Sequence, residues 1–428
     1  MLRRAIDLRP EEVRALAWSW LYIFSVLSAY YIIRPIRDEM GVASGVETLP
    51  WLFTGTLLGM LAVNPPFGAL VARLPRVRFI SIAYRFFTAN LLLFFLLLKG
   101  ATPAQSIWVG RIFFIWTSVF NLFVVSVFWA LMVDVFDAGQ GKRLFGVISA
   151  GATLGSILGS SVTAMLARHV GSAWLLLGSA CLLEIAVFSV RRLSLLSEPL
   201  RLQPAARGME SPIGGGVLAG FTHAFRSRYL LNISLYMLLY SITSTFLYFE
   251  QATIVNRNFA DRAARTVFFA QVDLLVNALT LGAQLLLTQR LLRGLGMALT
   301  LALLPALSVL GFATLGLTPT VAIIVMFQVL RRTSNFAVAR PTREVLFTVI
   351  PREDKYKAKS FIDTVIYRSG DQIGAWSYAL LSALGLSLTG IALSAVPLSA
   401  AWLLNGFWLG REQERMGAAK GPLSRLPA

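Results

Sequence analysis

Apolar runs of about twenty residues recur from one end of this sequence to the other, and they constrain the fold more than any other feature. A run of that length crosses the hydrocarbon core of a bilayer as an α-helix. The runs are continuous, whereas the strands of a membrane barrel alternate apolar and polar residues. The sequence therefore predicts an all-α polytopic membrane protein.

About twelve such runs are present, and each predicts one transmembrane span. In the first half of the chain they cover residues 13–36, 49–71, 79–98, 106–135, 144–166 and 172–190. In the second half they cover residues 229–255, 266–287, 297–315, 321–338, 360–384 and 390–409. We therefore expect two halves of about six helices each.

The stretch between the halves is polar and broken by three prolines and the run Gly214-Gly215-Gly216, which is typical of a linker. The predicted organisation is an N-terminal six-helix half at residues 1–190 and a cytoplasmic linker at 191–228. A C-terminal six-helix half at 229–410 and a cytoplasmic tail at 411–428 follow. This layout resembles that of major facilitator transporters, in which parallel repeats hold the substrate near the membrane midplane.

The chain is strongly basic, with 39 lysines and arginines against 21 acidic residues. Most of these basic residues lie in the loops on the side of the N-terminus, which places both termini in the cytoplasm by the positive-inside rule. We therefore attribute the positive charge to topology and contact with lipid, and expect no nucleic acid partner. The predicted location is the inner (cytoplasmic) membrane.

The residues that build most catalytic and metal sites are scarce. The single cysteine, Cys181, lies in an apolar run, and neither His169 nor His223 has a metal-ligand neighbour at a useful spacing. The sequence contains no Gly-x-x-x-x-Gly-Lys-Ser/Thr phosphate loop. We therefore expect no enzyme activity, no catalytic residue, no metal and no cofactor.

Ionisable residues inside the predicted spans or next to their ends are the candidates for function, because such residues are costly to insert and usually face a cavity or a partner. Those predicted to bind substrate are Arg34, Arg37, Arg111, Glu250, Arg331 and Arg368. Those predicted to gate or to hold structure are Asp38, Lys142, Arg143, Asp273, Asp363 and Asp371. Structural alternatives are open for some of them: Arg111 lies close enough to a span end to reach the headgroups, and Asp363 could pair with Arg368.

Arg34 and Arg37 stand out because they share one helical face and lie toward the side of the membrane where arginine is scarce. Glu250 ends the seventh span at the position equivalent to Arg34 after a shift of six spans. A basic cluster on one half facing an acid on the other predicts a salt-bridge gate. Since guanidinium groups suit bidentate contact with phosphate, it also predicts a cavity for a small anion.

A weak internal echo supports duplication of the two halves. In each half a basic loop leads into a helix with glycines four residues apart: Gly151 and Gly155 in the first, Gly370 and Gly374 in the second. Small residues at this spacing allow helices to approach closely in membranes. We expect both glycine pairs to lie at helix contacts.

Several motifs resemble the ATP/ADP translocase family of plastids and intracellular bacterial parasites, a branch of the major facilitator superfamily. They are Arg34-Pro35-Ile36-Arg37-Asp38, Gly141-Lys142-Arg143-Leu144-Phe145-Gly146, Tyr248-Phe249-Glu250 and Arg340-Pro341-Thr342-Arg343-Glu344. The resemblance implies an ATP:ADP-type antiporter that exchanges nucleotides or another phosphorylated organic anion by alternating access. It also implies that Arg37 occupies the place of a family lysine.

The sequence departs from that family at two places. Asp371 stands where the family carries a lysine, and Thr117 and Asn121 are the nearest residues to an acid that the family carries on span four. Two other functions therefore stay open. One is a membrane anchor or sensor module that binds a cytoplasmic partner through its linker or tail. The other is proton-coupled export of an unrelated solute, with Glu250 or Asp273 as the proton site.

Overall fold

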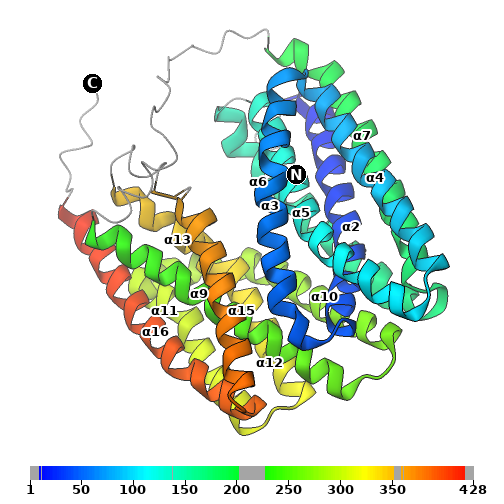
Figure 1. Cartoon of the computed structure of the whole chain (residues 1–428). Coiled ribbons are helices and arrows are strands. Elements are labelled where there is room, and N and C mark those ends of the chain that lie inside the picture. The colour runs from blue at the N-terminus through cyan, green and yellow to red at the C-terminus, as the bar shows by residue number, and fades with distance from the viewer. Residues whose placement is uncertain are drawn as a thin grey trace. The chain divides into compact units, whose positions relative to one another are not determined.

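The computed structural model describes residues 9–419, except residue 11, residue 137, residues 202–226, residues 351–357 and residue 360. Over this part of the chain it contains helices and no strand. Eleven of the described helices are long and apolar enough to cross a membrane. The prediction of an all-α polytopic membrane protein is therefore confirmed (Figure 1).

The chain forms two compact units. Unit 1 contains Met1–Glu210 together with Phe259–Asn277, and unit 2 contains Ser211–Asn258 together with Ala278–Ala428. One helix, α10 (Arg262–Leu286), is divided by this boundary, so that its first part belongs to unit 1.

The other helices of unit 1 follow one another with short connections. They are α2 (Glu12–Ala43), η1 (Val46–Thr48), α3 (Leu49–Arg73), α4 (Arg76–Gly100), α5 (Pro103–Val135), α6 (Ala138–Val170) and α7 (Ser172–Arg201). Within the unit, α2 packs against α5, α6 and α7 (Figure 1). The charged first span thus lies among three other helices.

The start of α5 is set by its own sequence. Thr102 accepts a hydrogen bond from the Gln105 backbone N–H at 3.4 Å, and the Gln105 side chain accepts one from the Thr102 N–H at 2.9 Å. This capping box satisfies two backbone donors that the first helical turn leaves without partners. Pro103, at the first helical position, lacks the N–H that would need a partner there.

Two glycines allow α6 to approach α2 closely. A Cβ atom on Gly155 would lie 2.4 Å from the Phe24 carbonyl oxygen, and one on Gly159 would lie 2.4 Å from the Ser28 carbonyl oxygen. Any larger residue would force the two helices apart. The sequence placed Gly155 at a helix contact, and the structure confirms it.

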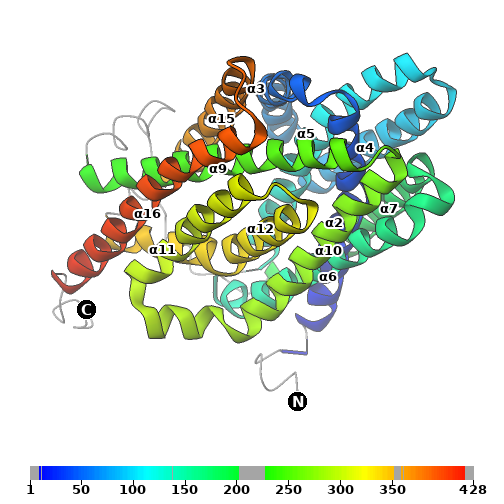
Figure 2. The same cartoon turned by 90° about the horizontal axis from the view of Figure 1, so that it is seen from below.

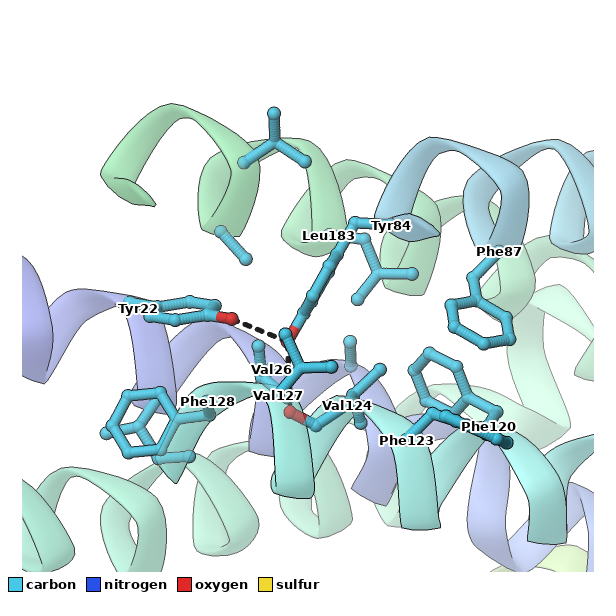
Figure 3. Close-up of a cluster of buried hydrophobic side chains, with 14 of the residues drawn as sticks. Tyr22, Val26, Tyr84, Phe87, Phe120, Phe123, Val124, Val127, Phe128 and Leu183 are labelled. Carbon is cyan, nitrogen blue, oxygen red and sulfur yellow. Dashed lines mark hydrogen bonds between the residues drawn. The ribbon is translucent and has the colours of Figure 1, made fainter. Parts of the chain in front are cut away.

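A chain of hydrogen bonds joins three helices inside unit 1. The Tyr22 hydroxyl donates to the Tyr84 hydroxyl at 2.8 Å, and the Tyr84 hydroxyl donates to the Val124 carbonyl at 3.1 Å (Figure 3). Both tyrosines are buried among apolar side chains that include Phe120 and Phe128. The two hydroxyls connect α2, α4 and α5. Burying them costs little free energy, because each donor has an acceptor.

Unit 2 contains α9 (Arg228–Asn258), α11 (Thr288–Leu317), α12 (Val321–Ser334), η2 (Asn335–Ala339), α13 (Arg340–Leu346), η3 (Phe347–Val349), η4 (Ile362–Ile366), α15 (Tyr367–Ala383) and α16 (Leu388–Ala419). Helix α9 lies beside α15 and α16, and α11 packs against α12 and α16 (Figure 2). Thr320 caps α12 by accepting a hydrogen bond from the Ile323 N–H at 3.4 Å.

One π-helical segment overlaps the end of the predicted span 321–338, and another lies within the predicted span 360–384. The first is η2, which continues α12, and the second is η4, which leads into α15. The predicted span 360–384, which contains η4 and the 17-residue helix α15, is not among the eleven candidates found among the described residues. A π-turn adds one residue to a helical turn and rotates everything after it.

Glycines also bring α15 close to α9 in unit 2. A Cβ atom on Gly370 would lie 2.6 Å from the Ser241 Cβ, and one on Gly374 would lie 3.0 Å from the Thr245 Cβ. The expected close packing at this second glycine pair is therefore confirmed. In both units glycines thus allow close packing of two helices: α6 on α2 in unit 1, and α15 on α9 in unit 2.

Two helices extend beyond the spans predicted from hydropathy. Helix α7 continues to Arg201 and α16 continues to Ala419, whereas the apolar runs end near residues 190 and 409. Hydropathy marks only the apolar part of a helix, and backbone hydrogen bonding continues into the polar part. Residues 202–226 of the predicted linker and residues 420–428 of the predicted tail lie outside the described residues.

Candidate functional site

Arg34 and Arg37 of α2 both have carboxylate partners within unit 1. Arg34 forms an ion pair with Asp273 of α10. Arg37 donates from Nη1 to the Oδ1 atom of the adjacent Asp38 at 2.7 Å. The two arginine side chains are 19% and 16% exposed, so both are largely buried. The carboxylates offset the cost of holding these charges in the spans.

Aromatic rings fix the direction of the two guanidinium groups. The Arg37 Cζ atom lies 3.8 Å from the centroid of the Phe114 ring, and the Arg34 Cζ atom lies 5.6 Å from that of Tyr31. A cation over a ring face gains electrostatic energy, more so where water is excluded. Each guanidinium group is thus oriented and partly exposed, and its paired N–H donors suit two oxygens of a carboxylate or a phosphate.

Unit 1 contains a further ion pair, between Arg262 and Glu39, that the sequence did not predict. Arg262 of α10 donates from Nε to Glu39 Oε1 at 2.7 Å and from Nη2 to Glu39 Oε2 at 3.1 Å. Arg262 also donates to the Ser106 hydroxyl at 3.1 Å. One signal could have found this pair: Arg262 is one of the few basic residues in the loops of its side, and Glu39 follows Asp38 just past the end of the first predicted span. Two ion pairs therefore join α10 to α2.

Arg111 and Arg143 make structural contacts in unit 1. Arg111 donates to the Ser44 carbonyl at 3.4 Å, and its Cζ lies 4.6 Å from the Trp108 ring centroid. Arg143 donates to both carboxylate oxygens of the buried Glu12, at 2.8 Å and 3.3 Å. Lys142 belongs to α6, but its side chain is outside the described part of the structure. Arg143 thereby links α6 to the start of α2.

Glu250 lies on α9 in unit 2 and is fully buried. Neither of its carboxylate oxygens has a hydrogen-bond partner among the described residues. The predicted closure of Glu250 against Arg34 and Arg37 stays a prediction. In this structure Arg34 is engaged by Asp273.

Arg331 of α12 is 2% exposed, and neutral oxygens hold it. It donates to the Ser308 hydroxyl at 3.1 Å, the Thr243 hydroxyl at 2.9 Å and the Tyr240 carbonyl at 3.2 Å. Its Cζ lies 5.3 Å from the ring centroid of Tyr240 and 5.8 Å from that of Trp402. Within the described part of the chain no carboxylate forms an ion pair with it.

Arg368 pairs with Asp371 and not with Asp363. The Arg368 Nη1 donates to Asp371 Oδ2 at 3.1 Å, and the Ser241 hydroxyl donates to Asp371 Oδ1 at 2.6 Å. Residues three apart share a helical face, whereas residues five apart point about 140° away from each other. The acid at position 371 thus ties α15 to α9, and Asp363 is exposed.

These features define the class of protein. A polytopic helical bundle with paired charges inside its spans is the organisation of a membrane transporter. The chain belongs to the Major Facilitator Superfamily, because the model of that family matches residues 16–357. It is a multi-pass membrane transporter of that type.

Known relatives agree with this assignment. The chain is 22% identical to "ADP,ATP carrier protein 2" of Chlamydia pneumoniae, over 92% of this chain and 87% of the carrier, which confirms the resemblance seen in the motifs. Its fold is similar to that of the nucleoside transporter NupG, with a TM-score of 0.59 at 12% identity, covering 96% of this chain and 100% of that one. A POT family peptide transporter gives a TM-score of 0.62 at 16% identity, covering 94% and 97%.

Proposed function

We propose that this protein is a secondary transporter, and not an enzyme, that exchanges nucleotides of the ATP and ADP kind or another phosphorylated organic anion by alternating access. The observation that carries this proposal is the pair of guanidinium groups of Arg34 and Arg37 on one face of α2. Both are largely buried, lie near aromatic rings and pair with side-chain carboxylates. Similarity to an ADP,ATP carrier supports the choice of a phosphorylated solute.

The mechanism follows from competition between anions. A phosphoryl group offers oxygens at the spacing that a guanidinium fork accepts, and it carries more charge than one carboxylate. An arriving phosphoryl group would therefore displace Asp273 from Arg34 and Asp38 from Arg37. Because Asp273 belongs to α10, its displacement would release one of the two ion pairs that join α10 to α2. Substrate binding would then weaken the connection between α10 and α2, and only the pair between Glu39 and Arg262 would still hold it.

The rest of the proposal concerns topology. We place the protein in the inner membrane with both termini in the cytoplasm, on the distribution of its loop charges. Alternating access in this fold moves one repeat relative to the other. We assign these repeats to the predicted halves at residues 1–190 and 229–410. The nucleotide would be cargo and not fuel, and no nucleic acid partner is involved.

Exchange in proteoliposomes tests the proposal. Purified protein is reconstituted, the vesicles are loaded with unlabelled ADP, and entry of labelled ATP is compared with that into empty vesicles. We expect loaded vesicles to take up label, Arg37→Gln to lose uptake, and Arg85→Gln to keep it. Arg85 is a matched control because its pair with Glu184 at 3.7 Å is about half exposed. Absence of uptake for ATP, ADP and other phosphorylated anions with folded protein would overturn the proposal.

A second candidate, proton-coupled transport, is favoured by Glu250. A fully buried carboxylate without a hydrogen-bond partner among the described residues is suited to gain and lose a proton during a cycle. Under this candidate Glu250→Gln would abolish uptake driven by a proton gradient and leave nucleotide exchange intact. Loss of both would tie Glu250 to exchange itself. If the protein moves no solute in the exchange assay or under a proton gradient, the remaining alternative is a membrane anchor or sensor module.

A further inference from the structure

A second group of arginines and aromatic rings lies in unit 2, separate from Arg34 and Arg37. Its arginines come from three different helices: Arg331 from α12, Arg343 from α13 and Arg368 from α15. Tyr240 of α9 and Tyr367 of α15 lie among them, with ring centroids 6.1 Å apart. We call these five residues the Tyr240 cluster.

Tyr240 contacts two of the three guanidinium groups. The Cζ atoms of Arg331 and Arg343 each lie 5.3 Å from the centroid of its ring. The third guanidinium, that of Arg368, lies over Tyr367 at 5.5 Å. Because cation–π contacts set the orientation of a guanidinium, the two tyrosines hold all three in place.

Arg343 is poorly satisfied by its own protein. Its Nη1 atom donates to the Met237 sulfur at 2.6 Å, and among the described residues no other hydrogen bond of this side chain is present. Thioether sulfur is a weak acceptor, and a guanidinium has five N–H donors. The side chain is half-buried, so it has donors available for a ligand.

Positive charge exceeds negative charge in the cluster. Asp371 forms an ion pair with Arg368, and the exposed Asp363 acts on Arg343 electrostatically. Arg331 has only neutral acceptors within the part of the chain that the structure describes. A buried cation without an ion-pair partner is costly to the protein. An anion that arrives from outside accounts for the excess.

The backbone is irregular on both sides of the cluster. The π-helical segment η2 lies between Arg331 and Arg343, and η4 ends directly before Tyr367. Each extra residue rotates the following side chains by about 100° about the helix axis. The π-turns therefore set the directions of Arg343, Tyr367 and Arg368. Such turns occur frequently at functional sites.

We propose that the Tyr240 cluster is a second oxyanion site, which binds a phosphoryl group of the transported solute. Arg343 and Arg368 contact the phosphoryl oxygens. The buried Arg331 contributes positive charge without direct contact. The rings of Tyr240 and Tyr367 orient the guanidinium groups. The site rests on the proposed function only for the identity of the solute. It adds to that function a phosphate contact in unit 2 made by residues other than Arg34, Arg37 and Glu250.

Binding to the purified full-length protein tests this site without requiring transport. ATP and inorganic phosphate are the probes, and the shift of the thermal unfolding midpoint with ligand concentration is the readout. We expect Arg343→Gln and Arg368→Gln each to weaken binding about tenfold to a hundredfold, the effect of losing charge-assisted hydrogen bonds. Arg343→Lys should recover part of the affinity, because it restores the charge without the fork. Arg340→Gln, on the exposed face of the same helix α13, should bind as the unaltered protein does.

The outcomes separate the two proposals. If Arg343→Gln binds phosphate more weakly and the unaltered protein shows no exchange in proteoliposomes, the site is supported and the transport proposal is overturned. Unchanged binding in Arg343→Gln and Arg368→Gln, with loss in Arg34→Gln and Arg37→Gln, overturns the site and leaves the transport proposal standing. If the unaltered protein shows no midpoint shift with either probe, the site is overturned.

Discussion

Arg34 of α2 forms an ion pair with Asp273 of α10, across 239 positions of the chain. A second ion pair, between Glu39 and Arg262, joins the same two helices. Helix α10 follows α9 in the second half of the sequence, whereas α2 is the first helix. Both pairs connect the same two helices, so they act together. Any movement that separates α10 from α2 must break both.

Removing one partner of the Arg34 pair should destabilise the protein. In Asp273→Asn the largely buried Arg34 loses its carboxylate, and breaking a buried pair typically costs about 3 kcal/mol or more. We expect a lower thermal unfolding midpoint, and we expect Arg34→Gln combined with Asp273→Asn to cost less than Asp273→Asn alone. Glu184→Gln, which breaks the half-exposed pair with Arg85, is the control and should cost less than about 1 kcal/mol. Equal losses in Asp273→Asn and Glu184→Gln would contradict the prediction.

The pair between Glu39 and Arg262 should be replaceable by its reverse. Glu39→Arg alone places two cations together and should abolish uptake in the exchange assay. Adding Arg262→Glu restores opposite charges on the two helices, and we expect part of the activity to return. Failure of the double variant to exceed the single variant, at equal amounts of folded protein, would show that charge complementarity is not what these residues supply.

The glycines on α6 and α7 should respond oppositely to alanine. Gly178→Ala fills open space and should stabilise its helix by up to about 1 kcal/mol, because alanine is the better helix former. Gly155→Ala places a methyl group 2.4 Å from the Phe24 carbonyl oxygen and should destabilise the packing of α6 on α2. Thermal unfolding midpoints of the two variants measure the difference. A rise in both would mean that α2 and α6 separate without cost.

The two buried tyrosines should differ in their cost of substitution. Tyr22→Phe removes a donor, whereas Tyr84→Phe removes both the acceptor of Tyr22 and the donor to Val124. A lost hydrogen bond costs about 1 kcal/mol, and a buried group left without a partner costs about 1–3 kcal/mol. We expect Tyr84→Phe to lower the free energy of unfolding more than Tyr22→Phe. Denaturation of both variants in one detergent, with the unaltered protein alongside, gives the comparison.

Part of the site was predictable because its signal is local. Arg34 and Arg37 stand out in the sequence as charges within an apolar span, and the structure places both where partners hold them. The close packing at Gly155 and Gly370 was predictable for a similar reason, since small residues at helical spacing mark one face of one helix. The ends of α7 and α16 could not be predicted from hydropathy, because both helices continue past the apolar residues that mark a span.

The sequence by itself determined that this chain is a helical membrane protein, because the cost of placing a polar backbone in hydrocarbon depends only on which residues follow one another. It also marked Arg34, Arg37 and Arg368 as charges that need partners. Only the tertiary structure decided what the partners are: Asp273 for Arg34, Arg262 for Glu39, and Asp371 in place of Asp363 for Arg368. Ion pairs form over a few ångströms between residues far apart in the chain, and the helical rotation set by a π-turn alters which side chains meet.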